Sequence, residues 1–453
     1  MVSIMGALAR IKGDVTEHLS RRAVEEVCRE VDHAWRRGPL DPAATVALFV
    51  RQVMEGNISC QQVRLLGDHP FTAPAYCLAR QRLPLELLEG LSRRVREAIG
   101  RGADNDEQYR WLGHRVHILD GTSFSMPDTP ELREHFGTPT GQRPGCGFPV
   151  AHLLALFDAR TGVWEADVVS PLHTGDVSNT PQVHGTVGEG DVVLGDDSFS
   201  GYAHIALLFQ GNKHALVPNH HRRRVDFTPR RPHARPGGRK KGDPAGLPTS
   251  RWIASLGEND QLVEWFKPTA KPRWMSDEQF AALPDSLVVR EVRRTVQRKG
   301  FRPITVAIIT TLLDQKKYPA DELIQLRMTR WGVETDLQHL KTTMGMDVLR
   351  CESVAGVKKE VAVFQIVYNL VRAVMMQASS RQHVGVDRIS FAHALAWIRH
   401  ARPEDPLPDL VVNPYRPDRV EPRAVKRRPK EYDRLTKPRQ ELQKELKNKE
   451  KTC

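Results

Sequence analysis

Three carboxylates are spaced so that they could bind metal ions together. Asp120 follows the apolar run at residues 116–119, and Asp196 follows a second short apolar run at residues 192–195. Such runs predict strands, and α/β proteins place their sites at strand ends. Asp197 stands beside Asp196 as a rival for the same role. An aspartate after an apolar strand is also a common turn residue or helix cap, so these positions alone leave both interpretations open.

The third carboxylate, Glu334, lies in a segment with helical spacing. Arg330, Glu334 and Lys341 occupy positions i, i+4 and i+11, and a rotation of about 100° per residue brings all three to one helix face. The alternative is a solvated face whose Arg–Glu pair contributes roughly a few tenths of a kcal/mol. The order of the carboxylates, with 76 positions between the aspartates and 138 from Asp196 to Glu334, favours a single site.

Clustered carboxylate oxygens bind hard divalent cations. We therefore predict that Asp120, Asp196 and Glu334 ligate Mg²⁺ or Mn²⁺, in a pair of ions that relieves the repulsion among the three charges. Two such ions position the attacking and leaving oxygens of a phosphodiester. Arg330 and Lys341 would then contact DNA phosphates.

The composition agrees with a nucleic-acid substrate. The 453 residues carry a formal net charge of +12, which favours a polyanionic partner. Six scattered cysteines without a Cys-x-x-Cys pair argue against a zinc ribbon or a disulfide framework. The chain has no apolar run of about 18 residues and no secretory signal, so we expect a cytoplasmic protein without a membrane partner.

The elements that must position these side chains divide the chain into five parts. Residues 1–108 show helical periodicity and predict an all-α DNA-binding region, in which residues 59–84 are compatible with a helix-turn-helix-like reader. Residues 109–217 give a three-strand meander and then strand, helix and strand. Residues 304–402 contain the helix of Glu334 and a long apolar helix. This order predicts an α/β fold with a ribonuclease H-like catalytic core.

An insertion and a tail complete the predicted architecture. Residues 218–303 predict a basic loop followed by a β-rich subdomain, and residues 403–453 a basic C-terminal tail whose last stretch is helical. The alternative to DNA binding is a solvated, disordered loop. We expect the cations of the basic loop to lie along DNA, among them Arg222, Arg223, Arg224, Lys240 and Lys241.

The insertion also carries three tryptophans. Trp252, Trp265 and Trp274 either fill a small β core, the more common case, or include one that stacks on a flipped base.

These motifs resemble the DDE transposases of bacterial insertion sequences, in the insertion-sequence-four family, across most of residues 60–380. In that family's third catalytic region, Tyr is followed after two intervening residues by Arg, after three more by Glu and after six more by Lys. Here Arg330, Glu334 and Lys341 match this spacing, and Arg327 stands at the position of the tyrosine. The segment at residues 118–122 is similar to the family's first Asp region. Residues 194–199 are similar to its second, with Asp197 in place of the usual Arg.

The resemblance implies a cut-and-paste DNA transposase of a bacterial, nucleoid-associated kind. Water would cleave the transposon end, the freed 3′ hydroxyl would form a hairpin intermediate, and strand transfer would follow. Its partners would be double-stranded DNA at inverted-repeat ends, target DNA and a second copy of the chain in a homodimer. Arg327 would reach a phosphate. The alternatives are a nuclease of the same fold that does not join strands and an inactive DNA-binding regulator.

Overall fold

A computed structural model describes residues 19–67, 69–104, 107–140, 145–234, 246–297, 303–400, 406–414 and 437–450. Its first part is helical, as the periodicity predicts. Ser20, Asp41, Ser59 and Thr72 each cap the helix that follows, because each side chain accepts a backbone N–H of the first turn. The helices are α2 (Arg21–Glu30), α3 (Pro42–Met54), α4 (Cys60–Val63), α5 (Ala73–Arg82) and α6 (Leu85–Asp104).

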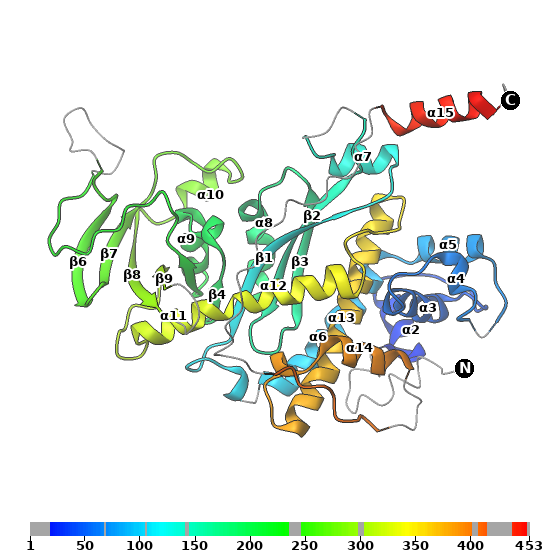
Figure 1. The fold of residues 1–453 in the computed structure, drawn as a ribbon, viewed down its shortest axis with the longest axis horizontal. Helices are drawn as coiled ribbons and strands as arrows, with labels where there is room; N and C mark the ends of the chain where they lie inside the picture. The colour runs from blue at the N-terminus through cyan, green and yellow to red at the C-terminus, as the bar shows by residue number, and fades with distance from the viewer. Residues whose placement is uncertain are drawn as a thin grey trace.

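One mixed sheet of nine strands runs through the rest of the molecule (Figure 1). The strand order is β3-β2-β1-β4-β5-β9-β8-β7-β6. Strand β4 pairs in parallel with β1 and with β5, and all other neighbours are antiparallel. The strands are β1 (Val116–Ser125), β2 (Val150–Asp158), β3 (Trp164–Pro171), β4 (Val192–Leu194), β5 (His214–Pro218), β6 (Ser250–Gly257), β7 (Asp260–Phe266), β8 (Ser286–Val296) and β9 (Ile304–Thr310).

Both faces of the sheet are covered, which explains the unbroken apolar runs in β1 and β4. Alternate residues of a strand point to opposite faces. Ile118 and Leu194 accordingly belong to one large hydrophobic cluster, and Leu119 and Val193 to a second. The covering helices are α7 (Pro130–Phe136), α8 (Asp176–Val183), α9 (Tyr202–Gln210), α10 (Asp277–Ala281), α11 (Ala320–Thr329), α12 (Trp331–Gln338), α13 (Val354–Gln382) and α14 (Phe391–His400), and α15 (Arg439–Glu450) lies near the C-terminus.

Helix α13 is the central element of the larger cluster. By length and composition alone it is the one described helix that could cross a membrane, yet 89% of its most apolar window is buried inside the protein. Asn369, near the middle of α13, accepts the backbone N–H of Trp164 at 2.9 Å and donates to its carbonyl at 2.9 Å. The helix is therefore fixed to β3 as a core helix.

Within residues 218–303, the predicted insertion, the described strands β6, β7 and β8 extend the core sheet. They do so because β9 pairs with β5 on one side and with β8 on the other. Arg290 reinforces this junction: its buried guanidinium lies 2.6 and 2.8 Å from the two oxygens of Asp260 and donates to the carbonyl of Tyr318 at 2.7 Å.

Candidate active site

The parallel pairing of β1 with β4 sets the positions of the two aspartates. In this register Ile118 lies opposite Leu194. Asp120 and Asp196 each follow two residues later, so both carboxylates emerge at the same end of neighbouring parallel strands. Asp120 is half-buried, and Asp196 is half-buried at the start of the turn after β4.

The sequence suggested that Asp120 ends its strand. In the structure β1 instead continues to Ser125 in antiparallel pairing with β2. Only the pairing with β4 ends before Asp120. The next residue, Gly121, donates its backbone N–H to Asp120 Oδ1 at 2.9 Å. A Cβ atom at Gly121 would lie 2.5 Å from the carboxylate of Asp176, so this close approach requires glycine.

Glu334 comes from a helical segment that is interrupted at one residue beside the aspartates. Helix α11 ends at Thr329 and α12 begins at Trp331, with Arg330 between them. Arg330 Nη1 lies 3.0 Å from Asp120 Oδ2, and its Nη2 lies 3.2 Å from Glu334 Oε1. One nearly buried guanidinium thus bridges the first and third predicted carboxylates.

Electrostatic interactions connect all three carboxylates. Burial raises the pKa of Asp120; Arg330 and the Gly121 N–H oppose this effect, while Asp196 and Glu334 add to it. The Arg327 guanidinium is in range of both aspartates. Burial and the neighbouring Arg330 lower the pKa of Arg327 to about 10, against the attraction of Asp196, Asp120 and Asp197.

Asp196 and Asp197 face different surroundings. Asp196 Oδ1 accepts the Ser198 backbone N–H at 2.8 Å and the Ser198 hydroxyl at 2.5 Å. Asp197 is exposed, and its Oδ2 lies 3.4 Å from Nδ1 of His221. The electrostatic neighbours of Asp120 include Asp196. The geometry therefore favours Asp196 over Asp197 as the partner of Asp120.

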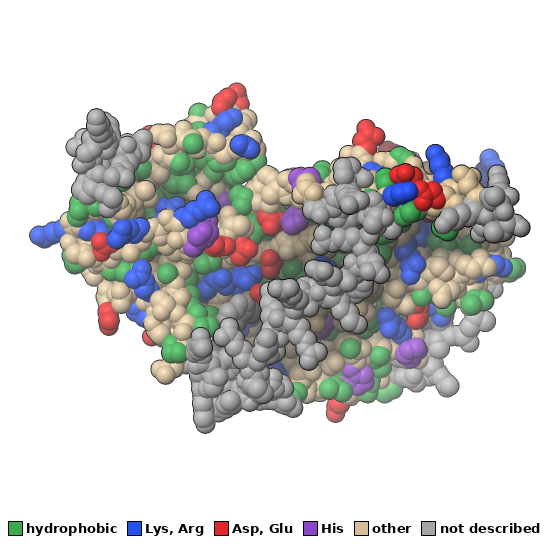
Figure 2. Space-filling model, turned by 45° about the horizontal axis from the view of Figure 1, so that its top comes forward, with side chains coloured by type: hydrophobic (Ala, Val, Ile, Leu, Met, Phe, Trp, Pro, Cys, Tyr) green, Lys and Arg blue, Asp and Glu red, His purple; other side chains and the backbone are tan. Residues whose placement is uncertain are grey.

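The cations predicted to bind DNA lie in several environments. Arg327 is half-buried, with a buried Nε that has no hydrogen-bond partner within the described parts of the chain. Lys341 lies on a π-helical turn, His339–Thr343, which changes its angular position from that of a regular α-helix. Figure 2 shows acidic side chains near the middle of one face of the molecule, with Lys and Arg side chains on both sides of them.

The basic segment after β5 is only partly available to a ligand. Arg222 and Arg224 are exposed. The guanidinium of Arg223 instead lies 3.5 Å from the centre of the Trp265 ring, and burial lowers its pKa to about 10 against the attraction of Glu291. Lys240 and Lys241 lie outside the described residues.

Trp265 fills the β core, since only 1% of it is exposed. Trp252 and Trp274 are half-buried. The burial of Trp265 agrees with the structural role considered for these tryptophans.

Two groups near the site were not singled out from the sequence. Asp176, at the start of α8, lies beside Gly121 and pairs with His152. His220 and His221 lie next to Asp197, and one potential ligand atom from each of the three residues falls within 4.8 Å of the others. The adjacent histidines were a visible signal, whereas nothing in the spacing of Asp176 indicated its place.

Comparisons with known proteins identify the family of this chain. Residues 111–370 match the family described as "Transposase DDE domain". The transposase InsG for insertion sequence element IS4 of Escherichia coli (strain K12) is 23% identical over 418 residues, which cover 88% of this chain and 86% of that protein. The putative transposase InsZ of the same organism is 29% identical over 155 residues, or 34% of this chain and 51% of that protein.

A solved structure is also similar. The synaptic complex of piggyBac transposase with hairpin DNA aligns with a TM-score of 0.42 and 10% identity, over 85% of this chain and 78% of that chain. The family match, which spans more than half of the 453 residues, carries the assignment. This protein therefore belongs to the DDE transposases, in the family of insertion sequence IS4.

Proposed function

We propose that Asp120, Asp196 and Glu334 are the catalytic carboxylates of a cut-and-paste DNA transposase and hold two divalent cations, Mg²⁺ or Mn²⁺. The single observation that carries this proposal is the bridge from Arg330 to both Asp120 and Glu334, at the end of the strand pair that positions Asp196. The Arg330 guanidinium lies between two carboxylates, where a positive charge reduces their mutual repulsion. Carboxylate oxygens suit hard cations, so the residues fit the metal.

The strand order supports a ribonuclease H-like core around this site. Strands β3, β2 and β1 form an antiparallel meander, and β4 and β5 continue it in parallel with β1. When bound, the metal ions supply an activated water and neutralise charge on the phosphodiester. The protein contributes rigid placement of two aspartates through sheet pairing, and of Glu334 through helix α12 and its contact with Arg330.

The nearby arginines would hold the DNA backbone. Arg330, when it is no longer needed to neutralise Asp120 and Glu334, is within reach of a phosphate bound at the carboxylates, and Arg327 offers an Nε without a partner among the described residues. We assign Lys341, Arg222 and Arg224 to flanking phosphates. Arg223 supports the insertion through its contact with Trp265.

The proposed reaction has four steps, in keeping with the family resemblance. Water hydrolyses the phosphodiester at the transposon end and releases a 3′ hydroxyl. That hydroxyl attacks the opposite strand, which forms a hairpin and releases the flanking DNA; a second water opens the hairpin. The 3′ hydroxyl then attacks a phosphodiester of the target DNA, which joins the transposon end to the target and releases a 3′ hydroxyl of the target strand. The working form is a homodimer on double-stranded inverted-repeat ends, in the cytoplasm and at the nucleoid.

Product analysis tests this proposal. The full chain is incubated with Mg²⁺, a duplex that carries the terminal inverted repeats of its element, and a supercoiled target plasmid. A transposase gives DNA joined to the plasmid, and the Asp120→Ala variant gives none. Cleavage without joining would identify a nuclease, and binding without nicking would identify an inactive regulator; either outcome would overturn the proposal.

A further inference from the structure

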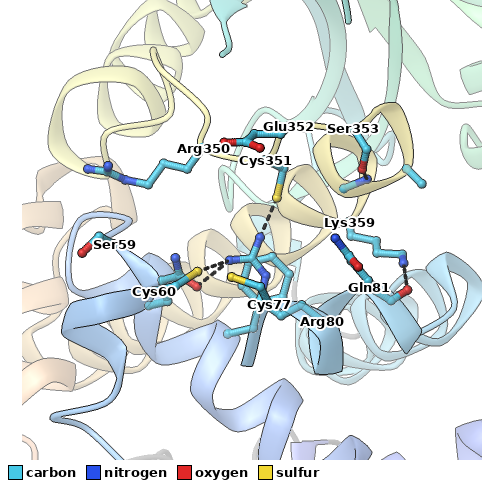
Figure 3. A pocket seen from close by; sticks show the side chains of 14 residues that line it. Ser59, Cys60, Cys77, Arg80, Gln81, Arg350, Cys351, Glu352, Ser353 and Lys359 are labelled. Atoms are coloured by element: carbon cyan, nitrogen blue, oxygen red, sulfur yellow. Dashed lines mark hydrogen bonds between the residues drawn. The ribbon is translucent and has the colours of Figure 1, made fainter. Parts of the chain in front are cut away.

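A cavity of about 650 Å³ lies away from the carboxylates, between the N-terminal helices and the start of α13. Helices α3, α4 and α5 line one side, and the chain from Arg350 to Lys359 lines the other (Figure 3). Three of its lining side chains are cationic, Arg80, Arg350 and Lys359, and one is a carboxylate, Glu352. The cavity adjoins the segment in which the sequence predicted a DNA reader.

Arg80 lies at the centre of this cavity without an anionic partner (Figure 3). Its Nη1 donates to Gln52 Oε1 at 2.9 Å and to Cys60 Sγ at 3.6 Å, and its Nη2 donates to Cys351 Sγ. The guanidinium carbon lies 4.1 Å from the centre of the Phe49 ring. Its Nε is buried and has no partner within the described ranges.

The thiols beside Arg80 do not supply the missing negative charge. Burial raises the pKa of Cys60 to about 11, with the Arg80 charge opposing that effect. Burial, together with Glu360, raises the pKa of Cys351 well above its usual range. Both side chains are therefore neutral thiols at pH 7. The carboxylate of Glu360 attracts the Arg80 charge but does not form an ion pair with it.

Lys359 also lacks an ion-pair partner among the described residues, although Glu86 attracts its charge from a distance. Only 9% of the residue is exposed, and its Nζ donates to the carbonyl of Gln81 at 2.8 Å. Burial lowers its pKa. The buried carboxylate of Glu360 accepts the backbone N–H groups of Arg350 and Cys351 at 2.9 to 3.1 Å. Neither Arg80 nor Lys359 has a carboxylate within ion-pair distance in the parts of the chain that the structure describes.

Buried charges in proteins are normally paired, because removal of an ion from water is costly. Two unpaired cations that line one open cavity indicate a ligand of negative charge. The first turn of α13, capped by Ser353, adds the positive end of a long helix to the same wall.

We propose that this cavity is a phosphate-binding pocket and that Arg80 and Lys359 bind a backbone phosphate of duplex DNA. The choice of DNA rests on the transposase function. The pocket lies beside α4 and α5, so a duplex anchored here would lie against the helices of the N-terminal region. A backbone phosphate carries no base identity, so the pocket would set the position of the duplex and leave sequence recognition to other groups.

The test compares Lys359→Met with Lys358→Met in the full chain. Lys358 is the adjacent residue on α13 and lies outside the cavity. Affinity for a duplex is measured over a series of KCl concentrations in EDTA, so that cleavage plays no part and failure of the catalytic assignment does not affect the result. We expect Lys359→Met to bind about tenfold more weakly and to lower the salt slope by about one, while Lys358→Met matches the wild type.

A second measurement separates a ligand site from a structural one. Removal of a cation that serves only folding should lower the thermal midpoint of the free protein. Removal of a buried cation without an ion pair should leave the midpoint unchanged or raise it. We expect the latter for Lys359→Met. A lower midpoint for this variant, or unchanged duplex affinity and salt slope, would overturn the proposal.

Inorganic phosphate tests whether the pocket binds a small free phosphate instead of a phosphate of the DNA backbone. Phosphate that binds the pocket should raise the thermal midpoint of the wild type and should have less effect on Lys359→Met. If phosphate stabilises the wild type in this way but the variant keeps full duplex affinity, the pocket binds a small free phosphate and the assignment to duplex DNA is wrong.

Discussion

Arg330 Nη1 lies 3.0 Å from Asp120 Oδ2, although 210 positions separate the two residues in the chain. The contact joins the junction between α11 and α12 to the middle of β1. Both side chains are largely buried, with 10% and 15% of their surfaces exposed. Glu334, on the other side of the same guanidinium, is 61% exposed. This ion pair and the burial of Val333 and Leu337 in the main core together fix the position of Glu334 relative to the sheet.

The three carboxylates should be indispensable for chemistry and dispensable for binding. Replacement of Asp120, Asp196 or Glu334 by Ala should reduce transposon-end cleavage by on the order of 10⁴-fold, because each removes a proposed metal ligand. Duplex affinity in EDTA should be unchanged. Asp197→Ala is the matched control next to Asp196 and should retain cleavage; the reverse result for the pair Asp196 and Asp197 would assign the second ligand to Asp197.

Arg330 should compete with metal in the free protein. In Arg330→Gln the charge between Asp120 and Glu334 is gone, so Mg²⁺ or Mn²⁺ should bind at least as tightly as to the wild type, while DNA cleavage falls. Calorimetric titration with Mn²⁺ measures the first effect and a cleavage assay the second. Weaker Mn²⁺ binding in Arg330→Gln would show that the arginine supports the metal site instead of standing in its place.

His117 should make stability depend on pH. It is fully buried, with Nδ1 at 2.5 Å from Glu165 and Nε2 at 3.0 Å from Asp191. Burial alone would lower its pKa, but Glu165 and Asp191 outweigh that effect and raise the pKa to about 10. Because the folded pKa lies above the unfolded value of about 6.5, the stabilisation is complete below pH 6.5 and is lost as pH rises towards 10.

Urea unfolding at several pH values between 6 and 10 checks this expectation. The wild type should lose on the order of a few kcal/mol across the range. His117→Gln lacks the titrating group, so its free energy of unfolding should change less with pH, whatever its absolute stability. Parallel curves for the two proteins would contradict the role of His117.

The three consecutive arginines after β5 should differ in function. Replacement of both Arg222 and Arg224 by Ala should lower the salt slope of duplex binding by about two, because two phosphate contacts are lost. Arg223→Met should leave the slope unchanged but reduce stability by about 1–2 kcal/mol, since it removes the contact with Trp265. A slope that falls with Arg223→Met would place this arginine on DNA.

The sequence predicted those features that depend on local periodicity. The apolar runs before Asp120 and Asp196 indicated neighbouring strand ends, and the structure pairs those strands in parallel. The continuation of β1 through Gly121 was missed because small and polar residues there are typical of a turn. The π-helical turn at His339 was also missed, since α-helical spacing alone does not reveal a change of pitch.

The sequence also could not predict which strands and side chains far apart in the chain come into contact. The extension of the core sheet into the insertion depends on β9, whose partners β5 and β8 are set by tertiary packing. In the same way, the contact between Arg80 and Cys351 joins residues 271 positions apart. The sequence indicated that the segment of Arg80, residues 59–84, is compatible with a DNA reader, but it could not show that Arg80 forms no ion pair among the described residues.

The place of β9 in the chain also determines when the sheet can be completed during synthesis on the ribosome. Synthesis runs from the N-terminus, and long-range strand pairing is slow. Both aspartates emerge early, but β9 closes the edge of β5 only after the inserted strands have been made, and the helix of Glu334 follows β9. A nascent or truncated chain that ends before this helix has two of the three proposed metal ligands. We therefore expect the chain to be inert towards DNA until residue 334 of its 453 residues has been made.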